Sequence, residues 1–383
     1  MLVFLAVEEL TKHFADLTDP RVERTRWHEL SDLIVIALCG TICGCESWED
    51  LPRYGREKFE WLSGFLELPN GIPSADTFAR VFQRLNPDEF LKCLLAWIEV
   101  LRGEQTHELI AIDGQTLKGS DSTAFGGRGP LHLVRAWATQ HRLVLGQQAC
   151  AEKSNEIEAI PRLLKLIDVK DAIVTIDAMG CQKEIAQQIR EQEGDYVLAL
   201  KDNHPKLCEA VRQAFEAEQA REAAGEKPRY RKTVTQNTGH GRDEERTYYH
   251  MPVPKDLPGA AAWKDLQSLG MVIRRRDTKG AEQIECQFHL CSLRTSVRRY
   301  AKAVRKHWSI ENELHWMLDV NFAQDASRIR KDHGPENSSI LRQAALMILR
   351  HDTQLSGSLR GKRKRAGWNN QRLEDLLLQK NKH

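Results

Sequence analysis

Two short stretches, Leu109-Ile-Ala-Ile-Asp113 and Ala172-Ile-Val-Thr-Ile-Asp177, decide the fold of this 383-residue chain. Each is an apolar run rich in isoleucine that ends in aspartate, a pattern typical of a buried strand. Ligand sites collect at strand ends of open α/β sheets, because loops open there from rigid backbone. Carboxylates at such ends suit a hard cation such as Mg²⁺, but aspartate also caps turns well, and both explanations stay open.

The segments around these two stretches complete an α/β pattern. Residues 131–138 and 143–149 predict two strands that a turn at 139–142 joins into a hairpin. Helices are predicted within 157–167 and 185–189, and a further strand over 196–201. Three strands, a helix, a strand, a helix and a strand predict a mixed sheet flanked by helices over residues 106–206.

The first part of the chain, residues 1–105, predicts a helical domain. We expect one helix capped by Ser31, a second capped by Ser74, and a third that opens at Asn86 and Pro87. Two helices joined by a tight turn fit a DNA-reading pair, and they equally fit ordinary helix packing. DNA binding is therefore one candidate role for this domain.

Residues 207–297 predict an insertion subdomain that is mostly β. A charged helical stretch over 207–226 is followed by four segments of strand character at 230–235, 246–250, 271–276 and 284–290. The sequence returns to a strongly helical pattern from Arg298 to Leu318, within a segment 298–350 that we assign to the α/β domain. Glu311 lies among apolar neighbours there, which indicates a carboxylate directed inward, although a solvated helix charge is the alternative.

The composition is that of a folded protein, with 41% hydrophobic and 29% charged residues. It excludes disordered, collagen-like and disulfide-scaffold classes. Because 56 Lys+Arg nearly balance 54 Asp+Glu, any binding of nucleic acid must come from local basic patches. Residues 351–383, with eight Lys or Arg and three Asp or Glu, form a basic tail of net charge +5 that suits phosphates or is simply solvated.

Cysteine usage and hydropathy bear on location. The nine cysteines lack zinc-site spacing, and the longest apolar stretch, residues 33–45, is too short to span a bilayer. The first residues lack the basic flank of a signal peptide. We therefore expect a reduced cytoplasmic setting and no membrane partner.

Six strings resemble the ISAs1-type insertion-sequence transposases, the H-repeat-associated group of the IS4-like DDE class. They are Ala111-Ile-Asp-Gly-Gln-Thr-Leu-Lys-Gly119, Lys153-Ser-Asn-Glu-Ile157, Thr175-Ile-Asp-Ala-Met-Gly-Cys-Gln182, Asp195-Tyr-Val-Leu-Ala-Leu-Lys-Asp-Asn203, Gly239-His-Gly-Arg242 and His307-Trp-Ser-Ile-Glu-Asn312. Together with Asp19-Pro-Arg21 and the segment from Gly71 to Thr77, they extend the resemblance over nearly the whole chain.

The resemblance implies an RNase H-like core whose catalytic acids are Asp113, Asp177 and Glu311. In such a site Asp113 bridges two Mg²⁺ ions, with Mn²⁺ as a substitute, and each other acid holds one ion. The alternative third acid is Asp325. The implied reaction is metal-dependent cleavage and transfer of DNA strands, with element ends and target DNA as partners, a homodimer on DNA, and a bacterial, nucleoid-associated location.

Further residues are candidates for contacts with DNA, and a structural role is the alternative for each of them. Where the IS4-like helix often has Tyr, Arg and Lys, this chain has Val304, His307 and Leu318, so those three roles are not carried over. Two rival functions are a transposase-derived DNA-binding protein without catalysis and an RNase H-like nuclease without end specificity. The candidate DNA contacts are Lys118, Lys201, Asn203, His240, Arg242, His307, His315, Lys362, Arg363, Lys364 and Arg365.

Overall fold

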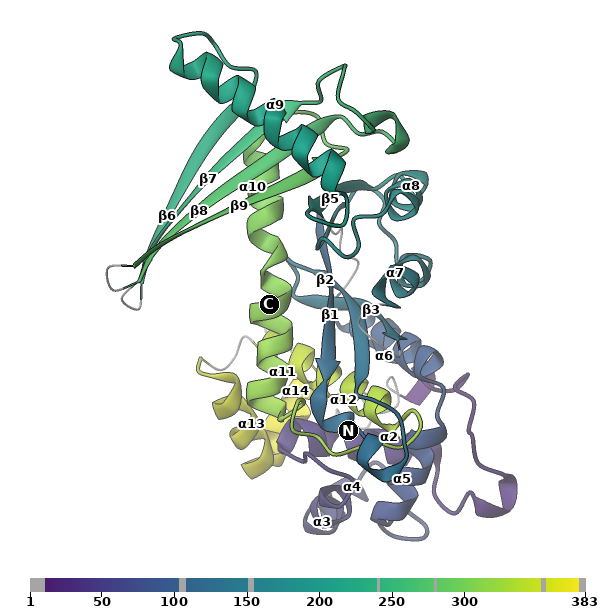
Figure 1. Cartoon of the computed structure of the whole chain (residues 1–383). Coiled ribbons are helices and arrows are strands. Elements are labelled where there is room, and N and C mark those ends of the chain that lie inside the picture. Colours follow the sequence, from purple (N-terminus) through teal and green to yellow (C-terminus); the bar gives the residue numbers. More distant parts are fainter. Residues whose placement is uncertain are drawn as a thin grey trace.

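The computed structural model describes residues 11–102, 108–150, 155–239, 242–278, 281–352 and 356–378. Figure 1 shows a helical body at one end of the molecule and a group of long strands projecting at the other. A twisted sheet and a long helical segment connect these two ends. None of the helices described combines the length and the hydrophobicity that crossing a membrane requires.

The core is a five-stranded mixed sheet in the order β3-β2-β1-β4-β5. β2 pairs antiparallel with β1 and β3, whereas β1, β4 and β5 are parallel. Helices α7 and α8 cover one face, and α10 packs against β1 and β4. This topology is RNase H-like and confirms the expected fold class. The bounds are β1 (Leu109–Leu117), β2 (Leu131–Ala138), β3 (Leu143–Cys150), α7 (Glu156–Leu164), β4 (Ile173–Ile176), α8 (Lys183–Glu191), β5 (Asp195–Leu200) and α10 (Val297–His307).

The strand β1 is longer than the apolar run predicts. It continues four residues beyond Asp113, because antiparallel pairing with β2 extends as far as Leu117. The parallel pairing of β1 with β4 stops earlier, at Ile112 opposite Ile176. Asp113 and Asp177 are therefore the first residues beyond the parallel ladder, side by side at one edge of it.

The insertion forms the strands that the sequence predicts, but it is not separate from the core sheet. Its last strand, β9, pairs antiparallel with β5, so the order continues as β5-β9-β8-β7-β6 in one nine-stranded sheet. Each strand is longer than the predicted segment, since the antiparallel ladders run past the apolar residues into charged ones. The elements are α9 (Pro205–Ala223), β6 (Arg231–Gly239), β7 (Arg242–Pro252), β8 (Ser268–Thr278) and β9 (Ala281–Cys291).

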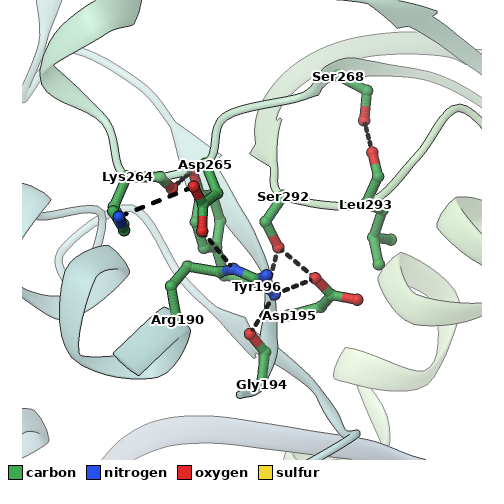
Figure 2. A network of polar contacts seen from close by, with 9 residues as sticks. All are labelled: Arg190, Gly194, Asp195, Tyr196, Lys264, Asp265, Ser268, Ser292 and Leu293. Carbon is green, nitrogen blue, oxygen red and sulfur yellow. Dashed lines mark hydrogen bonds and ion pairs between the residues drawn. The ribbon is translucent and has the colours of Figure 1, made fainter. Parts of the chain in front are cut away.

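A network of polar contacts fastens the insertion to β5 (Figure 2). The carboxylate of Asp195 accepts hydrogen bonds from Arg190 at 2.6 Å and from the hydroxyl of Ser292 at 2.8 Å. The Ser292 hydroxyl also accepts from the backbone N–H of Tyr196, whose own hydroxyl donates to the carbonyl of Lys264. The root of the long hairpins is thereby held against the core sheet.

The helical body combines helices from the N-terminal and C-terminal parts of the described residues. The helix α2 is buried along most of its length and packs against α12 and α13. Ser74 caps α5 as predicted, and Asn86 accepts from the first turn of α6, whereas α2 begins at Leu30 and has no side-chain cap, so the predicted Ser31 cap is wrong. The helices are α2 (Leu30–Cys43), α3 (Asp50–Glu57), α4 (Phe59–Leu62), α5 (Ala75–Arg84), α6 (Pro87–Arg102), α12 (Gly334–His351), α13 (Leu359–Trp368) and α14 (Asn370–Leu378).

Within the expected basic tail, the described residues 356–378 are folded. Helices α13 and α14 carry a buried apolar stripe of Ala366, Leu373, Leu376 and Leu377 that joins the core of the helical body. The basic residues between these apolar positions conceal the stripe in the sequence, which is why the segment reads as solvated. This part of the chain therefore completes the helical body.

Candidate active site

All three predicted acids line one cavity of about 360 Å³. Asp113 and Asp177 reach it from the edge of the parallel strands, and Glu311 reaches it from the segment that follows α10. Residues as far apart in the sequence as 113 and 311 meet there because α10 packs across β1 and β4. The catalytic role of the three acids remains a prediction at this point.

Asp113 has the most perturbed environment of the three. Burial, with a further contribution from the charge of Asp177, raises its pKa to about 7. Glu311 also raises this pKa, while the backbone N–H of Gly114 lowers it. Among the residues that the structure describes, no Lys or Arg forms an ion pair with these three acids. The site therefore concentrates negative charge that a cation from outside would relieve.

Asp177 sits in a turn that its own side chain shapes. Its Oδ1 accepts the backbone N–H of Met179 at 3.0 Å and that of Gly180 at 3.4 Å. Asn203 steadies the same turn, since its amide donates to the carbonyl of Ala178 at 2.7 Å. The turn-capping role and the position at the cavity thus coexist, and Asn203 contacts protein backbone.

The expected continuous helix from Arg298 to Leu318 is interrupted. After α10 comes a π-helical segment, Ile310–His315, and then α11 (Trp316–Phe322). The wider turn buries Ile310, Leu314 and His315 together while the Glu311 side chain stays 55% exposed. π-Helical turns are rare and often mark functional sites.

Glu311 and His315 form a close pair. Nδ1 of His315 lies 3.0 Å from Oε2 of Glu311 and 3.8 Å from Oδ2 of Asp113. The hydrogen bond from His315 lowers the pKa of Glu311, and burial lowers the pKa of His315 to about 4. One ligand atom from each of these three side chains lies within 4.8 Å of the other two, a grouping that can hold a metal ion.

Asp325, the alternative third acid, has a different partner. Its carboxylate pairs with Lys118 Nζ at 2.9 Å and also accepts the backbone N–H of Lys118. The described residues that line the cavity include neither Asp325 nor Lys118. This geometry favours Glu311 over Asp325 as the third acid.

Two of the predicted DNA contacts, Lys201 and His307, line the cavity beside the acids. Lys201 is exposed and follows β5 directly. Nδ1 of His307 lies 2.9 Å from the Thr175 hydroxyl, and burial lowers the pKa of His307. Lys201 is therefore the freer of the two to meet a phosphate.

The other predicted DNA contacts are divided. His240 lies outside the described residues, and Arg242 is described as the first residue of β7, opposite Gly239. In the basic run on α13, Lys362 and Arg363 bind backbone carbonyls of the protein itself. Lys364 and Arg365 are exposed and can meet DNA.

Sequence reasoning missed the contribution of the insertion to this cavity. Gln287 and His289 of β9 line it, since β9 continues the sheet beside β5. Their spacing of two residues places both on one face of a strand, but local sequence does not indicate which strand β9 joins. Trp308, 45% exposed, also lines the cavity.

A glycine next to Asp113 is required by packing. A Cβ at Gly114 would lie 2.3 Å from both Glu156 Oε1 and His132 Nε2. These two side chains are buried and form a hydrogen bond of 2.7 Å on the opposite face of β1 from Asp113. The backbone beside the catalytic candidate is thereby pressed against a polar pair.

Two family models match consecutive parts of the chain. Residues 11–98 match the model of a DDE_Tnp_1-associated domain, and residues 104–348 match the model of a transposase DDE domain. The chain is 34% identical to "Putative transposase YncI" of Escherichia coli O157:H7, covering 97% of this chain and 95% of that protein. It is also 34% identical to "H repeat-associated putative transposase YhhI" of Escherichia coli K12, with 97% and 98% covered.

Among solved structures, the piggyBac transposase in a synaptic complex with hairpin DNA aligns with a TM-score of 0.43 and 11% identity, over 99% of this chain and 80% of that one. The two domain matches cover most of the chain, and the two bacterial relatives align along nearly all of it. By these matches the chain belongs to the family of DDE transposases.

Proposed function

We propose that this chain is a Mg²⁺-dependent DNA transposase that cleaves DNA at the ends of an insertion sequence and joins those ends to target DNA. The observation that carries the proposal is the convergence of Asp113, Asp177 and Glu311 on one cavity. Membership of the DDE transposases supports DNA cleavage and strand transfer as the reaction class.

The residues present fit divalent cations. Three carboxylates share the cavity, and burial, together with the charge of Asp177, raises the pKa of Asp113, a cost of ionisation that a bound cation would offset. Asp113, Asp177 and Glu311 would hold the ions through oxygen atoms, which are the ligands Mg²⁺ prefers. Divalent cations at such a site supply charge neutralisation at the phosphodiester and activation of its nucleophile.

The surrounding side chains have separate tasks in this proposal. Lys201 offers a cation to the phosphate next to the cleaved bond. Asn203 keeps the turn after Asp177 in place through its bond to the Ala178 carbonyl. Exposed Lys364 and Arg365 contribute to binding of the DNA backbone. Joining two element ends in one event calls for two active sites, so we propose a homodimer on DNA, acting in the bacterial cytoplasm at the nucleoid.

A nicking assay tests the proposal. The full chain is incubated with Mg²⁺ or Mn²⁺ and with DNA that carries the inverted ends flanking the gene, or with random DNA of equal length. We expect nicking at the ends, its loss in Asp113→Asn and Asp177→Asn, and retained DNA binding by both variants. Asp202→Asn, an exposed acid beside Lys201, is the matched control and keeps wild-type activity.

The same assay separates the rival functions. Equal nicking of random DNA would indicate a nuclease without end specificity. End binding without nicking by the wild-type chain would indicate a DNA-binding protein that has lost catalysis. Nicking by Asp113→Asn at the wild-type rate would contradict the assignment of the acids.

A further inference from the structure

The imidazole of His315 is buried against the acidic cluster. The residue is 1% exposed, and its Nδ1 faces Oε2 of Glu311 and Oδ2 of Asp113 at 3.0 and 3.8 Å. The other ring nitrogen, Nε2, is buried and has no hydrogen-bond partner among the described residues. Within that part of the chain, the polar contacts of this ring are therefore the two carboxylates.

The separations match the spacing of ligands around one ion. Adjacent ligands of a six-coordinate ion with bonds of about 2.1 Å are about 3.0 Å apart, and opposite ligands about 4.2 Å. The distances from Nδ1, 3.0 and 3.8 Å, lie within this interval. Since the three ligand atoms all lie within 4.8 Å of one another, one ion could contact Asp113, Glu311 and His315 once the two carboxylates adjust around it.

The local backbone supports a ligand role for this histidine. Glu311 and His315 belong to the same π-helical segment, which brings both side chains near the Asp113 carboxylate, Glu311 from the lining of the cavity and His315 from the buried interior. A buried ring nitrogen without a hydrogen-bond partner is costly. If position 315 served only to fill the core, an apolar residue in a regular α-helix would therefore be more stable there than histidine.

We propose that His315 is a nitrogen ligand, through Nδ1, of the divalent cation held by Asp113 and Glu311, and that this position therefore prefers Mn²⁺ over Mg²⁺. The inference rests on the proposed function, since it takes the two acids as metal ligands. Imidazole nitrogen suits transition metals, whereas an all-oxygen set suits Mg²⁺. In the metal-bound state the ring proton is on Nε2.

Pulsed electron paramagnetic resonance of the full chain loaded with Mn²⁺ tests the inference without relying on activity. We expect electron spin-echo modulation from a directly bound ¹⁴N nucleus in the wild-type protein, and its loss in His315→Gln. The modulation persists in His307→Gln, the matched control, because His307 lines the cavity beside the acids but its Nδ1 contacts Thr175. Absence of the modulation in Mn²⁺-bound wild type, or its persistence in His315→Gln, would overturn the inference.

Metal affinities give a second readout. His315→Gln is expected to weaken Mn²⁺ binding at least about 10-fold, and Mg²⁺ binding by less than about 3-fold. Equal losses for both ions, or no loss, contradict the proposed preference. The wild-type spectrum does not depend on whether the variant folds, and thermal melts of both variants identify a folding defect.

Asp113→Asn separates this inference from the proposed function. If Asp113→Asn loses Mn²⁺ and His315→Gln keeps wild-type binding, the histidine is not a ligand and the acidic site stands. If Asp113→Asn binds Mn²⁺ as the wild type does, the acidic site itself is wrongly assigned and the histidine inference falls with it.

Discussion

Two polar regions are built around Asp113 and Gln115, which lie two residues apart on β1. The regions differ in how far their polar and charged groups are paired within the protein. The acidic cluster consists of Asp113, Asp177 and Glu311. The polar layer around Gln115 consists of Gln115, Arg135, Gln324, Ser339 and Asp319. In the polar layer the Gln115 carbonyl accepts from Arg135 at 2.8 Å and from Gln324 at 2.9 Å, and its amide donates to Asp319 at 3.0 Å.

The difference shows where the fold pairs its own polar groups and where it leaves charged groups available to a ligand. Arg135 is completely buried, but it donates to Gln115 and to the Ser339 hydroxyl, so the polar layer matches most of its own groups. The acidic cluster instead leaves its carboxylates without a Lys or Arg partner among the described residues, and burial, together with the charge of Asp177, raises the pKa of Asp113 to about 7. Removing one partner from buried internal pairing is costly to the fold, whereas unmatched charge of one sign creates a place for a ligand.

The largest effect is expected within the acidic cluster. Glu311→Gln should lower DNA cleavage at least about 1,000-fold, because it removes an anionic ligand of the metal site. Asp325→Asn should change cleavage by less than about 5-fold, since Asp325 pairs with Lys118 instead. Single-turnover nicking rates compare the two variants. If Asp325→Asn lost more cleavage activity than Glu311→Gln, Asp325 would be assigned as the third acid in place of Glu311.

In the polar layer the expected effect is on stability. Arg135→Met should lower the free energy of unfolding by about 3–5 kcal/mol, because it leaves buried partners of the guanidinium without a donor. Urea denaturation measures this change, with the exposed Arg128→Met as control, for which we expect less than about 0.5 kcal/mol. A neutral Arg135→Met would mean that the polar layer contributes nothing to the fold.

The pH dependence of stability should reveal the buried carboxyl group of Asp113. In metal-free protein the pKa of Asp113 is about 7, against a usual value of 3.8 that applies to the unfolded chain. The folded state therefore binds more protons between these values, so Asp113 makes stability fall as the pH rises from about 4 to about 7. Relative to the wild type, the stability of Asp113→Asn should rise by about 3 kcal/mol over this range. Chemical denaturation at pH 4 and pH 7 measures the free energy of unfolding of both proteins. An equal change with pH in the wild type and in Asp113→Asn would contradict this prediction.

The smallest effects concern the basic run on α13. Its neighbours Arg363 and Lys364 differ in that the first has a partner inside the protein and the second is exposed. Arg363 is buried, donates to the Thr41 carbonyl at 3.0 Å and lies over the Phe322 ring, so Arg363→Ala should cost about 1–2 kcal/mol of stability. Lys364→Ala should leave stability unchanged and reduce the salt slope of DNA binding by about one charge. Thermal melts and salt titrations check the pair, and a reversed pattern would contradict the assignment of inward and outward roles.

The sequence was sufficient for the local elements. The core strands were predicted because apolar runs bounded by turn residues fix a strand locally, as at Ile173–Ile176. Ser74 and Asn86 were correct helix starts for the same reason, since a cap acts within four residues. The Ser31 cap failed because α2 is fixed by burial along its length, which starts the helix at Leu30 without any side-chain cap.

What the sequence by itself determined is therefore the order of strands and helices and, through the resemblance, which acids to compare. The tertiary structure alone decided that β9 joins β5, that α13 and α14 complete the helical body, and that Nδ1 of His315 faces Asp113 and Glu311. The reason is physical: local periodicity reports which face of an element is apolar, but the partner of that face is set by packing between residues that are up to hundreds of positions apart.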